Sequence, residues 1–556
     1  MKTFGRAGSC WVVVAVLAAC AGPGVGERGR APTAASRDRD LAGIRVVELE
    51  VAPQGPWAER YGVDLPHELS ASERALADML SRLPLRHAAS LSRATREIAR
   101  TSPDRANVPP ALVDGLMAWA GLVHPPPRLV TVEIPDDADG CDRAPGESCR
   151  AAMDSLVAQV RVTMAGSRDF HYGVGVARGS TGSTRMMVAL LEKTVELEPL
   201  AVSVAARDRL ALRGTLSSGL RNPTIDVIDP RGEWTSQPAS VSSNGSFAVD
   251  VSCRGRGMHQ VEVLAEGVHG PEVAANFPVY CGVRPPSALR VTLEELDPSI
   301  SADQLARAIY HYLEEERRLR GLPSLEWDDR AAAVAEEHSL DMARHEYVGH
   351  RSPRTGDVKN RFERARIRYT VLRENVARGY GPRGIHDSLM NSPGHRVNIV
   401  AADVTHVGIG VVIAEPATNV PGAPRPLFVT QNFYRKPGAG APSDDQLVPT
   451  MRARVDAVRE SARLPPAQWD PKLEKIALRV AQAFAQGRSP GRFDAEVFEL
   501  GYQSVETVRV ESPDFEALAT IDVWKQQPLH GAIGIAPVGR GEDRRFLMVV
   551  LLAVPE

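Results

Sequence analysis

The stretch GLPSLEWDDRAAAVAEEHSLDMA, at residues 321–343, decides how the region around it folds. Residues 303–320 place apolar side chains at helical spacing, with Glu and Arg on the opposite face. Gly321-Leu322-Pro323 ends this first helical pattern, and a second one begins after Trp327-Asp328. We expect one face of the second helix to be buried, so we interpret the histidine on it as a core residue rather than a ligand. That face contains Ala331, Val334, Ala335, His338 and Met342.

A series of short motifs follows these two helices. In chain order they are GHRSP (349–353), ENVARG (374–379), NSPGHRVNI (391–399), HVGIGVVIA (406–414) and LFVTQNF (427–433). Together with the helices, the series resembles the CAP superfamily, which includes cysteine-rich secretory proteins, antigen five, plant pathogenesis-related proteins and bacterial exported proteins. The resemblance covers residues 296–436 and implies an α-β-α sandwich with an open cleft on one face.

The resemblance also implies which side chains line the cleft. By motif position they are His350, Glu374 and His395. The family's remaining acidic position falls near Ser392, where this sequence has no carboxylate, and Leu389 replaces the usual Trp. Two imidazoles and a carboxylate can hold a divalent metal such as zinc, act as acid and base, or hydrogen-bond across the cleft and order its loops. The sequence leaves these roles open.

The N-terminus has the features of a lipoprotein signal at residues 1–20. Lys2 and Arg6 precede an apolar run that is too short to span a bilayer. The run ends in Leu17-Ala18-Ala19-Cys20, which resembles the bacterial lipobox, in which the cysteine is diacylated. This implies a protein of the cell envelope that is anchored to the lipid bilayer through Cys20. An ordinary secretory signal that contains a cysteine is the alternative.

Four further cysteines lie beyond the signal. Cys141 and Cys149 bracket a loop rich in Gly, Asp and Pro, whereas Cys253 and Cys281 each end a strand-like run. Four thiols allow three pairings, and these positions favour pairing of neighbours. Neither pair has the CxxC spacing of a zinc site. We therefore predict two disulfides, Cys141–Cys149 and Cys253–Cys281, in an oxidising compartment.

The whole chain is predicted to be a multidomain α+β protein. Residues 199–285 contain short alternating apolar runs separated by turns, which predicts an immunoglobulin-like β-sandwich. Polar segments rich in Gly and Pro are predicted to connect the folded units. The predicted order is a signal (1–20), a tether (21–41), a diverged α/β domain (42–198), the sandwich (199–285), the CAP domain (296–436), a linker (437–446) and a degenerate CAP-like domain (447–556).

An internal repeat supports the last of these assignments. LPPAQWDPKLEKIA, which begins at Leu464, repeats LPSLEWDDRAAAVA, and Arg492 stands at the position of His350. His530 is one candidate counterpart of His395. We therefore interpret the C-terminal segment as a CAP-like domain that has lost its cleft. The segment 42–198 ends in a similar strand pair, and we interpret it as a more diverged CAP relative.

The charge of the chain limits its function. A net charge of −3 and the lack of any Lys/Arg run argue against nucleic-acid binding. We predict an envelope lipoprotein whose CAP domain binds a lipid, peptidoglycan or protein ligand without catalysis, with weak divalent-metal binding in its cleft. One alternative is a metal-dependent hydrolase or peptidase that uses the three cleft residues. Another is a surface adhesin with a vestigial cleft.

Overall fold

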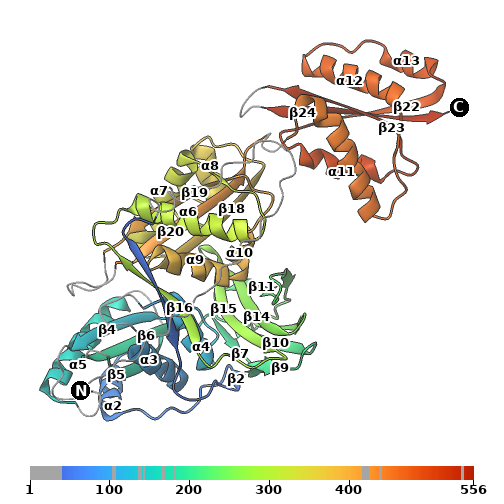
Figure 1. Ribbon diagram of the computed structural model, residues 1–556. Coiled ribbons are helices and arrows are strands. Elements are labelled where there is room, and N and C mark those ends of the chain that lie inside the picture. Colours follow the sequence, from blue (N-terminus) through green and yellow to red (C-terminus); the bar gives the residue numbers. More distant parts are fainter. Residues whose placement is uncertain are drawn as a thin grey trace, which may run out of the picture.

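The computed structural model describes residues 41–102, 108–134, 141, 145–164, 170–179, 182–415, 425–437, 441–539 and 544–555. The predicted signal, with Cys20, and nearly all of the predicted tether lie outside these residues. The described residues form four folded units, which we call the first domain, the sandwich, the third domain and the C-terminal domain (Figure 1). Among the described residues, no helix is both long and apolar enough to cross a membrane.

The third domain consists of a four-stranded sheet between two layers of helices. Strand order is β17-β19-β20-β18, with β17 parallel to β19 and the other neighbours antiparallel. Helices α6 and α9 share a core with one face of the sheet, and α7 and α8 pack on the other face. The elements are α6 (Ala302–Leu319), β17 (Glu326–Trp327), α7 (Asp329–His345), α8 (Val358–Arg364), β18 (Val371–Gly379), α9 (Pro382–Asn391), α10 (Pro393–Ile399), β19 (His406–Ile413) and β20 (Leu427–Arg435).

The GIG sequence in β19 explains why α7 lies so close to the sheet. A Cβ atom at Gly408 would lie 2.2 Å from the backbone nitrogen of Ala332, and one at Gly410 would lie 2.0 Å from that of Glu336. Both distances are far below van der Waals contact, so only glycine allows this approach. The intervening Ile409 faces α6 on the opposite side of the sheet.

The same strand order occurs in two other sheets. The first domain has the order β3-β5-β6-β4 and the C-terminal domain β21-β23-β24-β22, each with one parallel pair followed by antiparallel pairs. The first domain contains α2 (Ala71–Leu80), β3 (Arg86–His87), α3 (Ala89–Thr101), α4 (Pro110–Trp119), β4 (Arg128–Ile134), α5 (Glu147–Thr163), β5 (Phe170–Arg178) and β6 (Thr184–Glu192). The C-terminal domain contains α11 (Leu447–Ser461), β21 (Gln468–Trp469), α12 (Pro471–Ala485), α13 (Phe493–Glu499), β22 (Tyr502–Ser512), η2 (Glu516–Thr520), η3 (Asp522–Lys525), β23 (His530–Val538) and β24 (Arg545–Pro555).

Close helix-to-strand packing through glycine also recurs in these two domains. Gly173 and Gly175 of β5 lie against the backbone of α3, and Gly534 of β23 lies against the backbone of α12 at Ala477. The three sheets therefore share their topology, and in each of them glycine in a central strand allows the second helix to pack closely against it. The predicted ends of the individual domains stay predictions.

The sandwich lies between the first and third domains in the chain. One sheet has the order β13-β10-β7 and the other β12-β11-β14-β15-β9, around a shared apolar core. Its strands are β7 (Val195–Leu197), β9 (Ser203–Val204), β10 (Arg209–Leu216), β11 (Arg221–Ile228), β12 (Trp234–Pro238), β13 (Ser246–Ser252), β14 (Gly257–Gly267) and β15 (Gly270–Cys281). Two further two-stranded pairs connect neighbouring units: the eight-residue strands β1 (Ile44–Val51) and β16 (Leu289–Leu296), and the short strands β2 (Arg60–Tyr61) and β8 (Leu200–Ala201).

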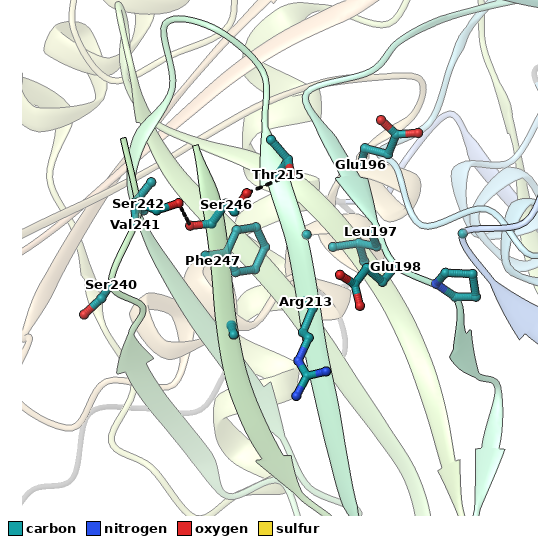
Figure 2. A pocket seen from close by; sticks show the side chains of 14 residues that line it. Glu196, Leu197, Glu198, Arg213, Thr215, Ser240, Val241, Ser242, Ser246 and Phe247 are labelled. Carbon is teal, nitrogen blue, oxygen red and sulfur yellow. Dashed lines mark hydrogen bonds between the residues drawn. The ribbon is translucent and has the colours of Figure 1, made fainter. Parts of the chain in front are cut away.

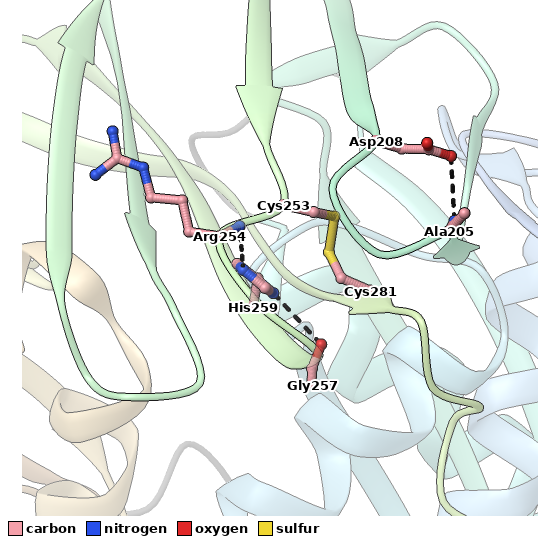
Figure 3. Close-up of a disulfide and its surroundings, with 7 residues drawn as sticks. All are labelled: Ala205, Asp208, Cys253, Arg254, Gly257, His259 and Cys281. Atoms are coloured by element: carbon pink, nitrogen blue, oxygen red, sulfur yellow. Dashed lines mark hydrogen bonds between the residues drawn. A yellow bond between two sulfur atoms is a disulfide. The ribbon is translucent and has the colours of Figure 1, made fainter.

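Both predicted disulfides are confirmed. Cys141 pairs with Cys149 in the first domain, and Cys253 pairs with Cys281 in the sandwich. Figure 3 shows the second bond, which connects the end of β13 to the end of β15. The multidomain mixture of helices and sheets is also confirmed, whereas the immunoglobulin-like character of the sandwich stays a prediction.

Candidate functional site

The three residues predicted to line the cleft lie together in the third domain. His350 is in the loop after α7, Glu374 is in β18 and His395 is in α10. The Nδ1 atom of His350 lies 3.0 Å from Oε1 of Glu374, and the rings of His350 and His395 are stacked, with centroids 6.4 Å apart. Residues 45 positions apart in the chain therefore form one cluster, as the motif order predicts.

Two asparagines hold His395 beside β18. Asn375, which is fully buried, donates from Nδ2 to the carbonyl oxygen of His395 at 3.1 Å. Asn398 donates to Oδ1 of Asn375 at 2.8 Å and to the carbonyl of Glu374 at 3.2 Å. These asparagines belong to the ENVARG and SPGHRVNI motifs, so their role is to join the strand that carries Glu374 to the helix that carries His395.

The carboxylate of Glu374 has partners on both of its oxygens. Oε1 accepts from His350, and Oε2 forms an ion pair with Arg361 of α8. Both Glu374 and Arg361 are buried. Burial opposes the charged form of Glu374, but the hydrogen bond from His350 and the positive charge of Arg361 hold its pKa below the ordinary value. Arg361 was not among the residues singled out from the sequence.

His395 is held in its neutral form. Burial lowers the pKa of His395 to about 3, and the nearby His350 adds to the effect. Its Nδ1 atom lies 2.7 Å from Oγ of Ser392, and this hydroxyl donates its proton to Oε1 of Glu262. Ser392 therefore accepts the Nδ1 proton of His395, which leaves Nε2 without a proton. Among the described residues, the Nε2 atoms of His350 and His395 have no hydrogen-bond partner.

A model of the cysteine-rich secretory protein family, CAP, matches residues 310–433. These residues are a CAP domain. The resemblance inferred from the motifs is thereby confirmed.

Two relatives match part of the chain in sequence. "Uncharacterized membrane protein YlbC" of Bacillus subtilis (strain 168) is 40% identical over 93 residues, which is 16% of this chain and 27% of that protein. "Uncharacterized protein YkwD" of the same organism is 36% identical over 98 residues, 17% of this chain and 38% of that protein. The match thus spans well under half the length of either relative.

Solved structures with similarity to this chain include two bacterial proteins. An extracellular protein containing a SCP domain from Bacillus anthracis str. Ames is 18% identical, with a TM-score of 0.20, over 41% of this chain and 64% of that one. A cysteine-rich secretory protein, SAV1118, from Staphylococcus aureus subsp. aureus Mu50 is 12% identical, with a TM-score of 0.21, over 48% and 85%.

The cluster in the CAP domain does not fit the zinc site considered from the sequence. A three-ligand site needs a carboxylate oxygen free to bind the metal, and both oxygens of Glu374 are engaged by His350 and Arg361. Within the described part of the chain, no group of three or more His, Cys, Asp or Glu side chains is placed to hold a metal ion. The two Nε2 atoms are the cleft nitrogens without a hydrogen-bond partner among the described residues.

The carboxylate that the local sequence lacks near Ser392 comes from another domain. Glu262 of β14, in the sandwich, accepts from Ser392 Oγ and, at 2.9 Å, from the backbone nitrogen of Gly394. Glu262 is 130 residues before Ser392, so no local pattern could have found it. Desolvation raises the pKa of Glu262 to about 7, and the nearby Asp226 adds to it.

The cleft of the CAP domain is also less open than the family resemblance implies. The tip of the β14–β15 hairpin lies beside His350: a Cβ atom at Gly270 would be 3.4 Å from the Cβ of His350. The backbone nitrogen of Arg351 donates to the carbonyl of His269 at 2.9 Å, and the His269 ring stacks on Tyr347 with centroids 4.4 Å apart. The expected open cleft is therefore corrected to one that the sandwich covers along an edge. The side chain of His350 keeps 25% of its surface exposed.

Two histidines outside the cluster have clear structural positions. His338 is fully buried and lies 2.9 Å from the carbonyl of Gly349, as expected for a core histidine that also steadies the loop before His350. His530 is paired with Gln468 at the register that pairs His406 with Glu326 in the CAP domain. The interpretation of His530 as a counterpart of His395 is therefore wrong, because strand register aligns it with His406.

A surface cavity of about 950 Å³ lies on the sandwich, away from the cleft (Figure 2). It contains charged groups from β7 and β10 and hydroxyl groups from the segment before β13. The side chains that Figure 2 labels are Glu196, Leu197, Glu198, Arg213, Thr215, Ser240, Val241, Ser242, Ser246 and Phe247. None of the cleft residues of the CAP domain lines this cavity, so it is a separate surface.

Proposed function

We propose that this protein is an exported lipoprotein of the cell envelope whose CAP domain binds a ligand without catalysing a reaction. The observation that carries the proposal is the engagement of Glu374 on both oxygens by His350 and Arg361. A carboxylate that activates water as a general base needs an oxygen free to accept its proton. Here Glu374, the carboxylate that the CAP domain contributes to the cleft cluster, serves instead to hold His350 in place.

The binding groups are the two imidazole Nε2 atoms. With Nδ1 of each ring engaged by Glu374 or Ser392, the Nε2 atom of each ring is the nitrogen left for a ligand, and in neutral His395 it is a hydrogen-bond acceptor. Two such nitrogens on nearly parallel rings suit a ligand that presents N–H or O–H groups. Peptidoglycan and polypeptides both carry such groups, as do the headgroups of some lipids.

The full-length protein and its His350→Ala/His395→Ala double variant test this role. Binding of soluble peptidoglycan fragments is measured by calorimetry, and hydrolysis is measured on a panel of peptides and esters with and without Zn²⁺. We expect binding that is lost in the double variant, no hydrolysis above the blank, and the same zinc titration for both proteins. Hydrolysis that disappears in the double variant would instead establish the metal-dependent hydrolase.

The lipid anchor has its own experiment. Cells that express the full chain are fed an alkyne fatty acid, and the protein is compared with its Cys20→Ala variant. We expect the label on the wild-type protein alone, because the lipobox cysteine is the acceptor of the acyl group. A Cys20→Ala protein that still takes up label would refute the anchor and leave the binding role untouched. The relative described as a membrane protein supports an envelope location.

A further inference from the structure

The contact between the sandwich and the CAP domain is built around one buried carboxylate. Glu262 is fully buried, and its two oxygens accept from the hydroxyl of Ser392 and the backbone nitrogen of Gly394. Asn276 of β15 adds a hydrogen bond from its Nδ2 to the carbonyl of Asn391 at 3.3 Å. Every one of these contacts falls on the segment that leads into His395. The sandwich therefore contacts the CAP domain at the wall of the cleft.

A second set of contacts lies on the other side of the cluster, next to His350. Arg351 donates from its backbone nitrogen to His269, and His269 Nδ1 lies 3.1 Å from the carbonyl of Arg351. A Cβ atom at Gly349 would lie 2.4 Å from the Cβ of His269, so glycine is required for this approach. One hairpin of the sandwich thus touches the chain beside both imidazoles of the candidate site.

We propose that the β-sandwich is an autoinhibitory cover of the CAP cleft, held closed by the contact of Glu262 with Ser392 and Gly394. The proposal rests on the binding role proposed above, since a cover matters only where the cleft takes a ligand. Access to the two Nε2 atoms then requires the β14–β15 hairpin to move away from α10 and from the loop at His350.

The charges at this contact make the cover reversible. Asp226 of β11 faces Glu262, and burial raises the pKa of Asp226 as well, although hydrogen bonds with Ser236 and Trp234 act in the opposite direction. From the CAP domain, the facing groups are Ser392 and neutral His395, and Arg396 lies instead against Gly232 at the turn after β11. On β15 the facing side chain is the neutral Asn276. Within the described part of the chain, the ionised form of Glu262 therefore has a carboxylate neighbour and no cation partner.

The direction of the pH effect follows from proton linkage. The pKa of Glu262 is about 7 when the cover is closed and near its ordinary value of 4.5 when Glu262 is exposed to water. Closure is therefore fully favoured below the ordinary value and is weakened as the pH rises through about 7. The closed-to-open ratio is expected to fall on the order of a hundredfold across this interval.

Two backbone amides report closure directly in the full-length protein. The Gly394 amide donates to Glu262, and the Arg351 amide donates to His269, so each has its acceptor in the sandwich. Amide hydrogen exchange, corrected for the intrinsic pH dependence, is measured at about pH 5.5 and about pH 8. The variants are Glu262→Gln, which keeps an acceptor but cannot ionise, and Glu266→Gln as a matched control on the same strand.

We expect both amides of the wild type and of Glu266→Gln to lose protection by about thirtyfold at the higher pH, because part of the linkage interval lies below pH 5.5, and those of Glu262→Gln to stay protected at both. Equal protection of the wild type at the two pH values, or the same loss of protection in Glu262→Gln, would overturn the proposal that Glu262 holds the cover closed. These outcomes involve no ligand, so they are independent of whether the binding role holds.

Access to the cleft is measured separately at about pH 8, where diethyl pyrocarbonate modifies neutral imidazoles. The modification rates of His350 and His395 are followed by mass spectrometry, with the exposed His345 as an internal reference. We expect both cleft histidines to react several-fold more slowly in Glu262→Gln than in the wild type. Equal rates in the two proteins would show that the sandwich does not restrict the cleft.

Discussion

The CAP domain and the C-terminal domain have the same sheet order, but the cluster of His350, Glu374 and His395 belongs to the CAP domain. Their common features lie in the framework. Arg317 of α6 and Arg459 of α11 are both fully buried, and each guanidinium donates to backbone carbonyls beyond its own helix. Asp328 and Asp470 each cap the second helix and accept from a tyrosine hydroxyl.

The two domains differ in the loop and the helix that follow the second helix of each domain. The CAP domain places His350 and Arg361 around Glu374, whereas the C-terminal domain has the exposed Arg492 at the position of His350. The C-terminal domain also lies apart from the sandwich (Figure 1), which supplies Glu262 to the CAP domain alone. The groups that the two domains share lie away from the cleft and stabilise the fold, so the cleft can change without loss of the framework.

The largest expected effect tests the shared framework. Arg317→Ala and Arg459→Ala each leave buried carbonyls without donors and a cavity behind, and each should cost its own domain about 3–5 kcal/mol. Urea unfolding followed by hydrogen exchange, which resolves the two domains, measures this. We expect each change to destabilise only the domain that contains it. Loss of both domains in either variant would mean that the two do not unfold independently.

A smaller effect tests the cleft. Arg361→Ala removes the cation beside buried Glu374 and should cost the CAP domain about 2–4 kcal/mol near neutral pH. Because the pKa of Glu374 is lowered in the folded protein, its stabilising contribution is present above the ordinary pKa and is lost as the pH falls through the folded value. The penalty should therefore shrink in acid.

Urea unfolding of the two proteins near neutral pH and near pH 3 measures this pH dependence. Arg364→Ala on the same helix is the control, because the Arg364 side chain is exposed and bonds only to the carbonyl of Thr355 among the described residues. A penalty for Arg361→Ala that is equal at both pH values would contradict the ion-pair account.

The smallest expected effect compares the two helix caps. Asp328→Ala and Asp470→Ala each remove an N-cap hydrogen bond, which costs about 0.5–2 kcal/mol. We expect the larger loss for Asp328, because Lys436 also pairs with its carboxylate at 2.9 Å. Thermal unfolding of the two variants and the wild type provides the measurement. A loss at Asp470 that equals or exceeds the loss at Asp328 would show that the ion pair with Lys436 adds no measurable stability.

Much of the CAP domain could be predicted from local pattern. The spacing of apolar residues predicts α6 and α7, Asp328 marks the start of α7, and the order of the motifs brings His350, Glu374 and His395 into one cluster. Neighbour pairing of the cysteines was also correct. These features depend on residues close in the chain or on motifs whose positions in the fold are tied to each other.

Other features of the site had no local signal. Arg361 belongs to no motif that was recognised in the sequence, yet it forms the ion pair that engages Oε2 of Glu374. The register of β23 aligns His530 with His406, although the sequence pattern allowed His395.

By itself, then, the sequence determined that a CAP domain is present, which three side chains meet in its cleft, and where the two disulfides form. Only the tertiary structure decided that Glu262 completes the cluster and that the sandwich covers the cleft edge. The physical reason is range: helix and strand periodicity and capping act over a few residues, whereas a buried contact between two domains depends on how their finished surfaces fit.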